Sequence, residues 1–266
     1  MIPELARSTL KAALRKGGET LITYLGRSME ARVKESISSV VTEADLASED
    51  AILAVLSDSG EACNIITEET GYMDRQSEYT WVVDPLDGTS NYAAGLPWFG
   101  VIIALFKGES PILGGMYLPV DDEIYLAEAG LSPTRNGEPI RVTVSPNLSE
   151  QLISYSFDFS KDPKKTKSEM EIMAHLSRKV RNIRSTNSLV DFCYTADGRL
   201  GAALNQTTKI WDIAVPWLMI REGGGIVTDI HGREISFDLT AEAVNLNYTI
   251  IASGTALHGP ILKTIS

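Results

Sequence analysis

Short apolar runs of strand length recur along this chain, and Gly, Pro or charged residues close each of them. After residue 150 these runs alternate with longer amphipathic segments, which predict helices. Alternation of this kind predicts an α/β fold in which helices are layered on sheets. We expect an N-terminal sub-domain over residues 1–148 and a C-terminal sub-domain over residues 149–266, with a cleft between them.

Local patterns also predict individual helices and one turn. A helix is predicted over residues 44–56, where Leu46, Leu53 and Leu56 fall on one face that we expect to be buried. Asn136-Gly137 stands between two apolar runs and predicts a hairpin turn. Further helices are predicted over residues 165–177, 188–196, 212–222 and 255–265.

The chain is acidic, since 24 Lys and Arg residues stand against 35 Asp and Glu residues and give a formal net charge of −11. Proteins that bind nucleic acid directly need a basic face, so we expect no such binding. No apolar run approaches the roughly 18 residues of a membrane helix, so we expect no membrane partner. Cys63 and Cys193 form no CxxC pair, which favours free thiols in a reducing cytoplasm.

Two aspartates follow the apolar run at 81–83. Asp84 ends this predicted strand, and Pro85 cannot continue the ladder, so we expect the chain to turn there. In a tight turn Asp84 and Asp87 can face one point, with the Leu86 carbonyl between them. Oxygen ligands in a compact arrangement suit Mg²⁺. A plain surface turn is the alternative interpretation, because Asp, Pro and Gly are common turn residues.

Gly88 and Thr89 come directly after this acidic turn. They offer backbone N–H groups and a hydroxyl, which are the donors that a phosphate oxygen needs. The turn is therefore a candidate site for a metal ion and a phosphate together.

Three more acidic residues stand at strand ends or helix starts. Glu68 follows the apolar run at 64–66, Asp212 opens a predicted helix, and Asp45 lies near another helix start. Each has an ordinary alternative, which is a solvated loop for Glu68 and a helix cap for the two aspartates. Taken with Asp84 and Asp87, they predict a cage of carboxylates.

Two motifs occur in a fixed order, Asp84-Pro85-Leu86-Asp87-Gly88-Thr89 and Trp211-Asp212-Ile213-Ala214, with Glu68-Glu69 before the first and Gly224-Gly225 after the second. In these motifs the chain resembles the inositol monophosphatase family, which are lithium-sensitive, magnesium-dependent phosphatases. The resemblance implies a layered α-β-α-β-α sandwich and a homodimer. It also implies two or three Mg²⁺ ions per subunit, with ligands from Glu68, Asp84, the Leu86 carbonyl, Asp87 and Asp212.

Catalytic roles follow from the same resemblance. It implies that Asp45 and Thr89 orient the attacking water, that Glu68 belongs to the catalytic set, and that the N–H groups of Gly88 and Thr89 bind the phosphate. The expected reaction is hydrolysis of a small phosphate monoester by in-line attack of water, without a phosphoenzyme.

The substrate pocket is expected to include Asn187, Ser188, Asn205 and Lys209. Asn205 stands where inositol-specific members usually carry Glu, and it can bind a hydroxyl but has no charge. Lys209 can meet a second phosphate or a substrate carboxylate, or it can be a solvated lysine near a helix start.

These residues leave the substrate open. Inositol monophosphate or a related sugar phosphate is the first expectation. Histidinol phosphate, 3′-phosphoadenosine 5′-phosphate and fructose 1,6-bisphosphate are the alternatives within the family. A regulatory role in ribosomal RNA transcription, with little catalysis, is the alternative from a different class.

Overall fold

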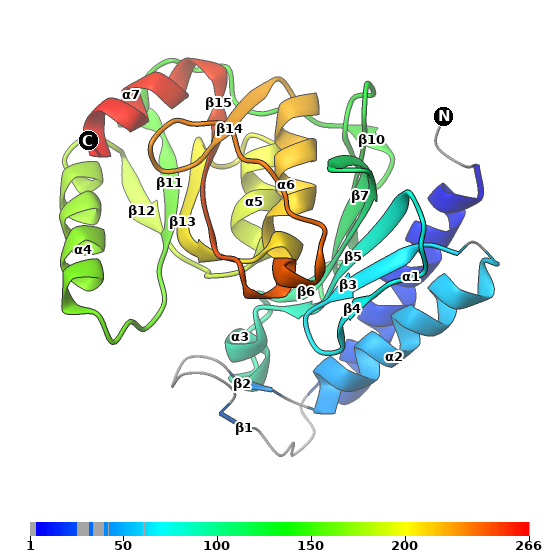
Figure 1. Cartoon of the computed structure of the whole chain (residues 1–266). Helices are drawn as coiled ribbons and strands as arrows, with labels where there is room; N and C mark the ends of the chain where they lie inside the picture. Colours follow the sequence, from blue (N-terminus) through cyan, green and yellow to red (C-terminus); the bar gives the residue numbers. More distant parts are fainter. Residues whose placement is uncertain (1–3, 26–31, 34–39, 42, 61, 266) are drawn as a thin grey trace.

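The computed structural model describes residues 4–25, 32–33, 40–41, 43–60 and 62–265. Its strands form two large sheets and one short two-stranded ladder. Helices lie on the outer face of each large sheet and also between the two sheets (Figure 1). The α-β-α-β-α sandwich that the family resemblance implied is therefore confirmed.

The larger sheet is built from the N-terminal half of the chain. Its strands are β3 (Asn64–Thr67), β4 (Gly71–Met73), β5 (Tyr79–Asp87), β6 (Gly100–Lys107), β7 (Ser110–Leu118), β8 (Glu123–Glu128), β9 (Thr134–Arg135) and β10 (Glu138–Pro139). Their spatial order is β10-β9-β8-β7-β6-β5-β3-β4, and only β3 and β5 run parallel. Asn136 and Gly137 join β9 to β10 with φ values of 50° and 86°, so the predicted hairpin turn is confirmed.

The smaller sheet is built from the C-terminal half. Its strands are β11 (Leu152–Ser156), β12 (Asn182–Arg184), β13 (Ala202–Thr208), β14 (Gly225–Thr228) and β15 (Tyr248–Gly254), in the order β12-β11-β13-β15-β14. β11 is parallel to both of its neighbours, and β15 is antiparallel to both of its own. The short ladder pairs β1 (Arg32–Val33) with β2 (Val40–Val41).

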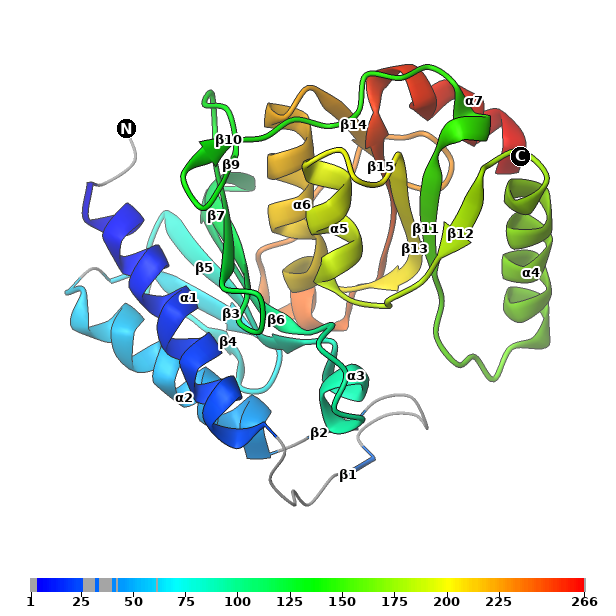
Figure 2. The ribbon, with the colours of Figure 1, turned by 180° about the vertical axis from the view of Figure 1, so that it is seen from behind.

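The helices form three layers, which Figures 1 and 2 show from opposite sides. α1 (Glu4–Tyr24) and α2 (Glu43–Asp58) cover the outer face of the larger sheet. α5 (Leu189–Ala196) and α6 (Ile210–Glu222) lie between the sheets, while α4 (Pro163–Ser177) and α7 (Thr255–Ile265) cover the outer face of the smaller sheet. The short α3 (Thr89–Ala93) follows β5, and η1 (Leu148–Glu150) and η2 (Ala241–Asn245) are single 3₁₀ turns.

Helix α6 is the centre of the sandwich. It packs on β5 to β8 with one face and on β14 and β15 with another. A helix covered on both sides must be apolar on nearly all of its surface, and buried side chains run from Ile210 to Ile220 with few interruptions. The polar exception near its start, Asp212, is therefore held at the junction of the two sheets.

Helix α2 buries Leu56 and part of Leu53, as its leucine spacing predicted, but not Leu46. Leu46 is 51% exposed, whereas Asp45, Ser48 and Glu49 are buried beside Ile52. The expectation for Leu46 was wrong because the spacing of apolar residues cannot show which polar side chains find hydrogen-bond partners in the interior. Here three of the six buried side chains of the helix are polar.

Two further expectations concern the cysteines and the membrane. Cys63 and Cys193 are both buried, and neither forms a disulfide. None of the described helices is both long enough and apolar enough to cross a membrane.

Candidate metal centre and active-site cleft

The parallel pairing of β3 and β5 brings the first two acidic residues together. Thr67 is the register partner of Val83, so Glu68 and Asp84 both follow at the same edge of the sheet. The carboxyl ends of parallel strands share one edge, which is why ligand sites gather there. Two residues distant in sequence are thereby made neighbours by the ladder.

The acidic turn is a bulge within a continuous strand. β5 runs through Pro85 to Asp87, and its pairing with β6 is irregular between Asp84 and Asp87. We expected the chain to leave the sheet at Pro85, and that expectation was wrong in form. Pro85 lacks the N–H that a regular ladder needs, so the strand bulges instead of ending. The backbone N–H of Leu86 donates to Asp84 Oδ1 at 3.0 Å and fixes that carboxylate within the bulge.

The third aspartate arrives from the other half of the molecule. Asp212 stands in the first turn of α6, where its Oδ2 accepts the backbone N–H of Lys209 at 2.7 Å. Lys209, and not Asp212, is the N-cap of α6, but Asp212 forms part of a capping box as the third residue of the helix. This contact occurs together with clustering. One carboxylate oxygen from each of Asp84, Asp87 and Asp212 lies within 4.8 Å of the others.

Burial and mutual repulsion dominate the electrostatics of this cluster. Burial, and then the charges of Glu68, Asp87 and Asp212, hold the pKa of Asp84 well above its ordinary value. Burial and the charge of Asp212 likewise raise the pKa of Asp87, although the Leu189 N–H opposes this by donating to Asp87 Oδ1 at 2.5 Å. Burial raises the pKa of Asp212 to about 6, against the opposing effect of the Lys209 N–H.

These carboxylates fit a divalent cation. Within the described part of the chain, no Lys, Arg or His side chain forms an ion pair with Asp84, Asp87 or Asp212. Crowded, desolvated carboxylates of this kind require a compensating positive charge. A hard cation that takes oxygen ligands supplies that charge.

Asp45 and Thr89 lie behind the bulge. Thr89 Oγ1 is 3.2 Å from Asp45 Oδ1 and 3.0 Å from the Leu86 carbonyl oxygen, so its hydroxyl proton is directed at acceptors on two elements. Asp45 is buried and Thr89 half-buried. This pair joins α2 to the start of α3.

Gly88 adopts a conformation and a position that exclude other residues. Its φ is 83°, and an added Cβ would lie 2.5 Å from the carbonyl oxygen of Trp98. Both the left-handed backbone and the close approach therefore demand glycine. The backbone between Asp87 and Thr89 can turn sharply here only because no side chain is present.

A cleft of about 720 Å³ opens beside the aspartates. Glu68, Asp84, Leu86, Asp87, Gly88, Thr89, Asn187, Ser188, Asn205, Lys209 and Asp212 all contribute to its lining. Every predicted site residue except Asp45 therefore lines one cavity, and Asp45 reaches it through Thr89. Sequence positions from 68 to 212 converge here because the cleft lies between the two sheets.

The loop before α5 forms one wall of the cleft. Asn187 has a φ of 51° and donates from Nδ2 to Asp158 Oδ1 at 2.8 Å. Ser188 is the N-cap of α5, where its hydroxyl accepts the Val190 N–H at 3.4 Å. Both predicted pocket residues are thus held by contacts of their own.

Strand β13 and its end form another wall. Asn205 Oδ1 accepts the Thr207 N–H at 2.8 Å, and in the described part of the chain no group accepts from its Nδ2. The Lys209 ammonium donates to the Val244 carbonyl at 3.1 Å, so this lysine is half-buried and anchored to η2 instead of being fully solvated.

One wall residue had no signal in the sequence. Asp191 on α5 is buried, and its Oδ2 accepts from Ser156 Oγ at 2.9 Å and from the Thr186 N–H at 3.2 Å. These contacts fix the loop that carries Asn187. The sequence around Asp191 is mostly apolar and does not indicate those partners.

Glu49 on α2 is a second residue near the site that we did not predict from the sequence. It follows Asp45 by four positions, so the two residues fall on one face of a helix, and this spacing could have indicated it.

Comparison with known proteins places this architecture in a family. The sequence matches the inositol monophosphatase family over residues 4–266. A relative named fructose-1,6-bisphosphatase/inositol-1-monophosphatase, from Aquifex aeolicus, is 31% identical, with 95% of this chain and 92% of that protein covered. Another, named Nus factor SuhB, from Haemophilus influenzae, is 33% identical, with 83% of each chain covered.

Solved structures agree with the sequence relatives. The extragenic suppressor protein suhB from Bartonella henselae superposes with a TM-score of 0.89 at 26% identity, with 98% of each chain covered. Family membership supports phosphatase activity, and the acidic cluster supports metal dependence. The chain belongs to the inositol monophosphatase family.

Proposed function

We propose that this protein hydrolyses a small phosphate monoester with Mg²⁺, and that inositol monophosphate or a related sugar phosphate is the substrate. The observation that carries the proposal is the convergence of Asp84, Asp87 and Asp212 at a cleft, without an ion-pair partner among the described residues. The −11 charge of the chain would repel a phosphate ester unless cations intervened at this point.

Five groups would hold the cations. They are the carboxylates of Glu68, Asp84, Asp87 and Asp212 and the carbonyl of Leu86, and we propose two or three Mg²⁺ ions per subunit. Ions bound there lower the pKa of water, neutralise the phosphate and stabilise the leaving oxygen.

Asp45 and Thr89 are proposed to manage the proton of the attacking water. The Thr89 hydroxyl is directed toward Asp45, so its oxygen can accept a proton from water while its own proton passes to the carboxylate. The N–H groups of Gly88 and Thr89 are proposed to bind the phosphate oxygens, and Glu68 completes the catalytic set.

The leaving group is proposed to lie along the polar wall of the cleft. Asn187, Ser188 and Asn205 offer amide and hydroxyl groups that match the hydroxyls of a polyol. Lys209 lies beside them, but its ammonium already binds the Val244 carbonyl. A neutral, hydroxyl-rich leaving group fits this wall better than a second phosphate.

A phosphate-release screen tests the proposal. Inositol 1-phosphate, histidinol phosphate, 3′-phosphoadenosine 5′-phosphate and fructose 1,6-bisphosphate are each supplied with Mg²⁺, with and without Li⁺. We expect the fastest release from inositol 1-phosphate, inhibition by Li⁺ and no release after chelation of Mg²⁺. Equal or faster release from one of the other three would replace the substrate, and release that survives chelation would contradict the metal mechanism.

A second candidate function is regulation of transcription. Two relatives at 33% and 34% identity are named Nus factor SuhB. If the screen finds no turnover on any of the four substrates, this role becomes the better proposal. Intact carboxylates at all the predicted metal positions favour catalysis.

A further inference from the structure

Helix α2 presents three polar residues on the face that it buries. Asp45, Ser48 and Glu49 have the i, i+3, i+4 spacing of one helical face, and each is at most 2% exposed. Burying carboxylates costs free energy unless hydrogen bonds compensate. The compensating partners lie on the turns that carry the proposed metal ligands.

Glu49 uses both of its carboxylate oxygens on the turn that carries Glu68. Its Oε2 accepts from the Thr67 hydroxyl and, at 3.1 Å, from the backbone N–H of Glu69. Its Oε1 accepts from the Thr70 hydroxyl. The donors come immediately before and after Glu68, so Glu49 holds the turn by hydrogen bonds on both sides of that residue. Hydrogen bonds to an ionised carboxylate are among the stronger ones in proteins.

The other two residues of this face contact the second acidic turn. The buried Ser48 hydroxyl donates to the Pro85 carbonyl oxygen at 2.7 Å, and Asp45 accepts from Thr89. One rigid helix therefore contacts the 67–70 turn and the 84–89 turn at the same time. Because the rise of a helix is fixed, these contacts set the position of one turn relative to the other.

We propose that Glu49 is a positioning residue that sets the affinity of the site for divalent cations by holding the Glu68 turn in register with Asp84 and Asp87. Glu49 does not line the cleft itself, so it acts through the turn. The inference rests on the proposed metal-dependent function. Glu49 contacts the turn and not the cation, so it should affect cation binding more than substrate binding.

The test is the variant Glu49→Gln. The amide keeps the length of the side chain but offers one acceptor oxygen to three donors. Mg²⁺ binding is measured by isothermal titration calorimetry, with Mn²⁺ binding by electron paramagnetic resonance as a second readout. We expect affinity to fall by roughly 10- to 100-fold, the usual cost of losing a group that orients metal ligands. Turnover at saturating Mg²⁺ and the KM for substrate should change much less.

Two further variants separate positioning from general damage. Thr70→Val removes one donor, so it should weaken Mg²⁺ binding by a smaller factor. The loss in Glu49→Gln/Thr70→Val should be smaller than the product of the two single losses, because both variants break the same contact. Thr70→Val also provides the test if Glu49→Gln does not fold.

Glu169→Gln is the matched control. Glu169 is a helical carboxylate at 1% exposure on α4, and its ion pair is with Lys165 of the same helix. Among the described residues no hydrogen bond or ion pair links it to either acidic turn. It should leave Mg²⁺ affinity unchanged. The proposal is overturned if Glu49→Gln binds Mg²⁺ like the wild type, or if Glu169→Gln weakens binding equally. A wild-type protein that binds no Mg²⁺ would instead overturn the proposed function.

Discussion

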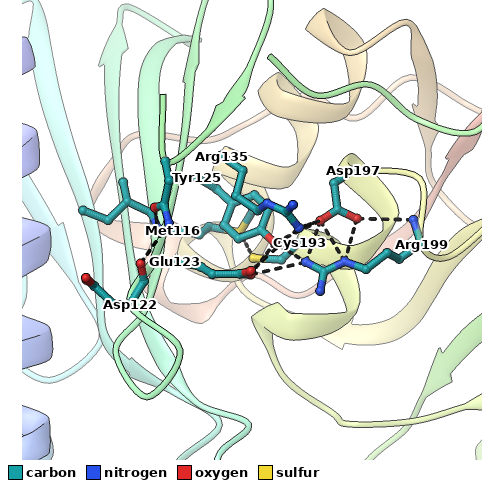
Figure 3. Close-up of polar contacts among 10 residues, drawn as sticks. Met116, Asp122, Glu123, Tyr125, Arg135, Cys193, Asp197 and Arg199 are labelled. Carbon is teal, nitrogen blue, oxygen red and sulfur yellow. Dashed lines mark hydrogen bonds and ion pairs between the residues drawn. The ribbon is translucent and has the colours of Figure 1, made fainter. Parts of the chain in front are cut away.

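Two groups of crowded carboxylates in this molecule have opposite electrostatic surroundings. Asp84, Asp87 and Asp212 meet at the cleft, and within the described residues no basic side chain forms an ion pair with them. At the C-terminal end of α5, Asp197 and Glu123 are each paired with both Arg135 and Arg199 (Figure 3).

The paired cluster satisfies its own charges. The side chain of Asp197 is 4% exposed, and its oxygens accept from Arg199 Nε at 2.9 and 3.0 Å and from Arg135 Nη1 at 3.1 Å. The Tyr125 hydroxyl lies 3.0 Å from Asp197 Oδ2, and the Arg199 guanidinium stacks 3.7 Å over the ring of Tyr194. Nothing in this arrangement calls for an added ion.

The difference shows how to tell structural from functional acid in an acidic protein. Both clusters bury carboxylates between elements distant in sequence. Among the described residues only the cluster at the cleft lacks an ion pair with a basic side chain, and burial together with the charges of neighbouring carboxylates raises its pKa values. The net charge of the chain cannot distinguish the two clusters, whereas the ion pairs of each carboxylate do.

The largest expected effect is that of Asp84→Asn. Phosphate release should fall on the order of 10³-fold or more, equivalent to about 4 kcal/mol of activation free energy, because the central cation ligand is lost. In chelator the variant should be no less stable than the wild type, because a repelling charge has been removed. Mg²⁺ at 100 times its Kd should stabilise the wild type by about 2.7 kcal/mol and the variant far less.

Enzyme assays and urea denaturation with and without Mg²⁺ measure both effects. Near wild-type turnover in Asp84→Asn would show that the unpaired cluster is not the metal site. Unfolding of the variant in chelator would show that its carboxylate is structural, as in the paired cluster.

A smaller effect is expected from the same change in the paired cluster. Asp197→Asn removes the more buried of the two carboxylates that Arg135 and Arg199 share, so the free energy of unfolding should fall by about 1.5–3 kcal/mol. Mg²⁺ affinity and turnover should stay at wild-type levels in the folded protein. Calorimetric titration with Mg²⁺ checks this, and weakened binding would remove the distinction between the two clusters.

The smallest expected effect comes from His258, which lies apart from both clusters. Its Nε2 is 3.0 Å from Thr228 Oγ1 and its Nδ1 is 2.9 Å from Ser253 Oγ. Because Thr228 donates its proton to the Asp229 carbonyl, Nε2 carries the hydrogen and Nδ1 accepts from Ser253. Burial lowers the pKa of this histidine, so it is held neutral.

A lowered pKa in the folded state means that the unfolded chain binds the proton first. Stability should therefore fall as pH drops below the unfolded value of about 6.5, by at most about 1.4 kcal/mol per pH unit. The part of the loss due to His258 is the difference between the wild type and His258→Gln, and that difference should be equal with and without Mg²⁺. The cleft aspartates, whose pKa values are raised, add a slope of the opposite sign in chelator, and the comparison of the two proteins removes it. Denaturation series of both proteins from pH 7 to pH 5 test this, and a difference that Mg²⁺ abolishes would assign the titration to the cleft instead.

Much of the site could be predicted because several of its functional residues are close together in the sequence. An apolar run followed by Asp84-Pro85-Leu86-Asp87 places two carboxylates within one bulge, whatever surrounds them. The layered fold followed from the alternation of elements and from family resemblance. The detailed form of the turn did not, because Pro85 is compatible with either a strand end or a bulge.

The tertiary structure decided which hydrogen-bond and ion-pair partners the buried polar side chains have. Leucine spacing suggested a buried face for α2 that included Leu46, but the hydrogen bonds of Glu49 to the 67–70 turn turned a polar face inward. Arg135 and Asp197 are 62 positions apart, and only the packing of β9 beside the end of α5 makes them a pair.

The sequence by itself thus determined which carboxylates stand at strand ends and helix starts, because local backbone preferences act over a few residues. Only the tertiary structure decided which carboxylates are neutralised by arginine, which turn is held by Glu49, and that Asp84, Asp87 and Asp212 meet at the cleft with no ion pair to a described basic side chain. The reason is physical, since the free energy of a buried charge depends on every group that packs around it, and those groups come from the whole length of the chain.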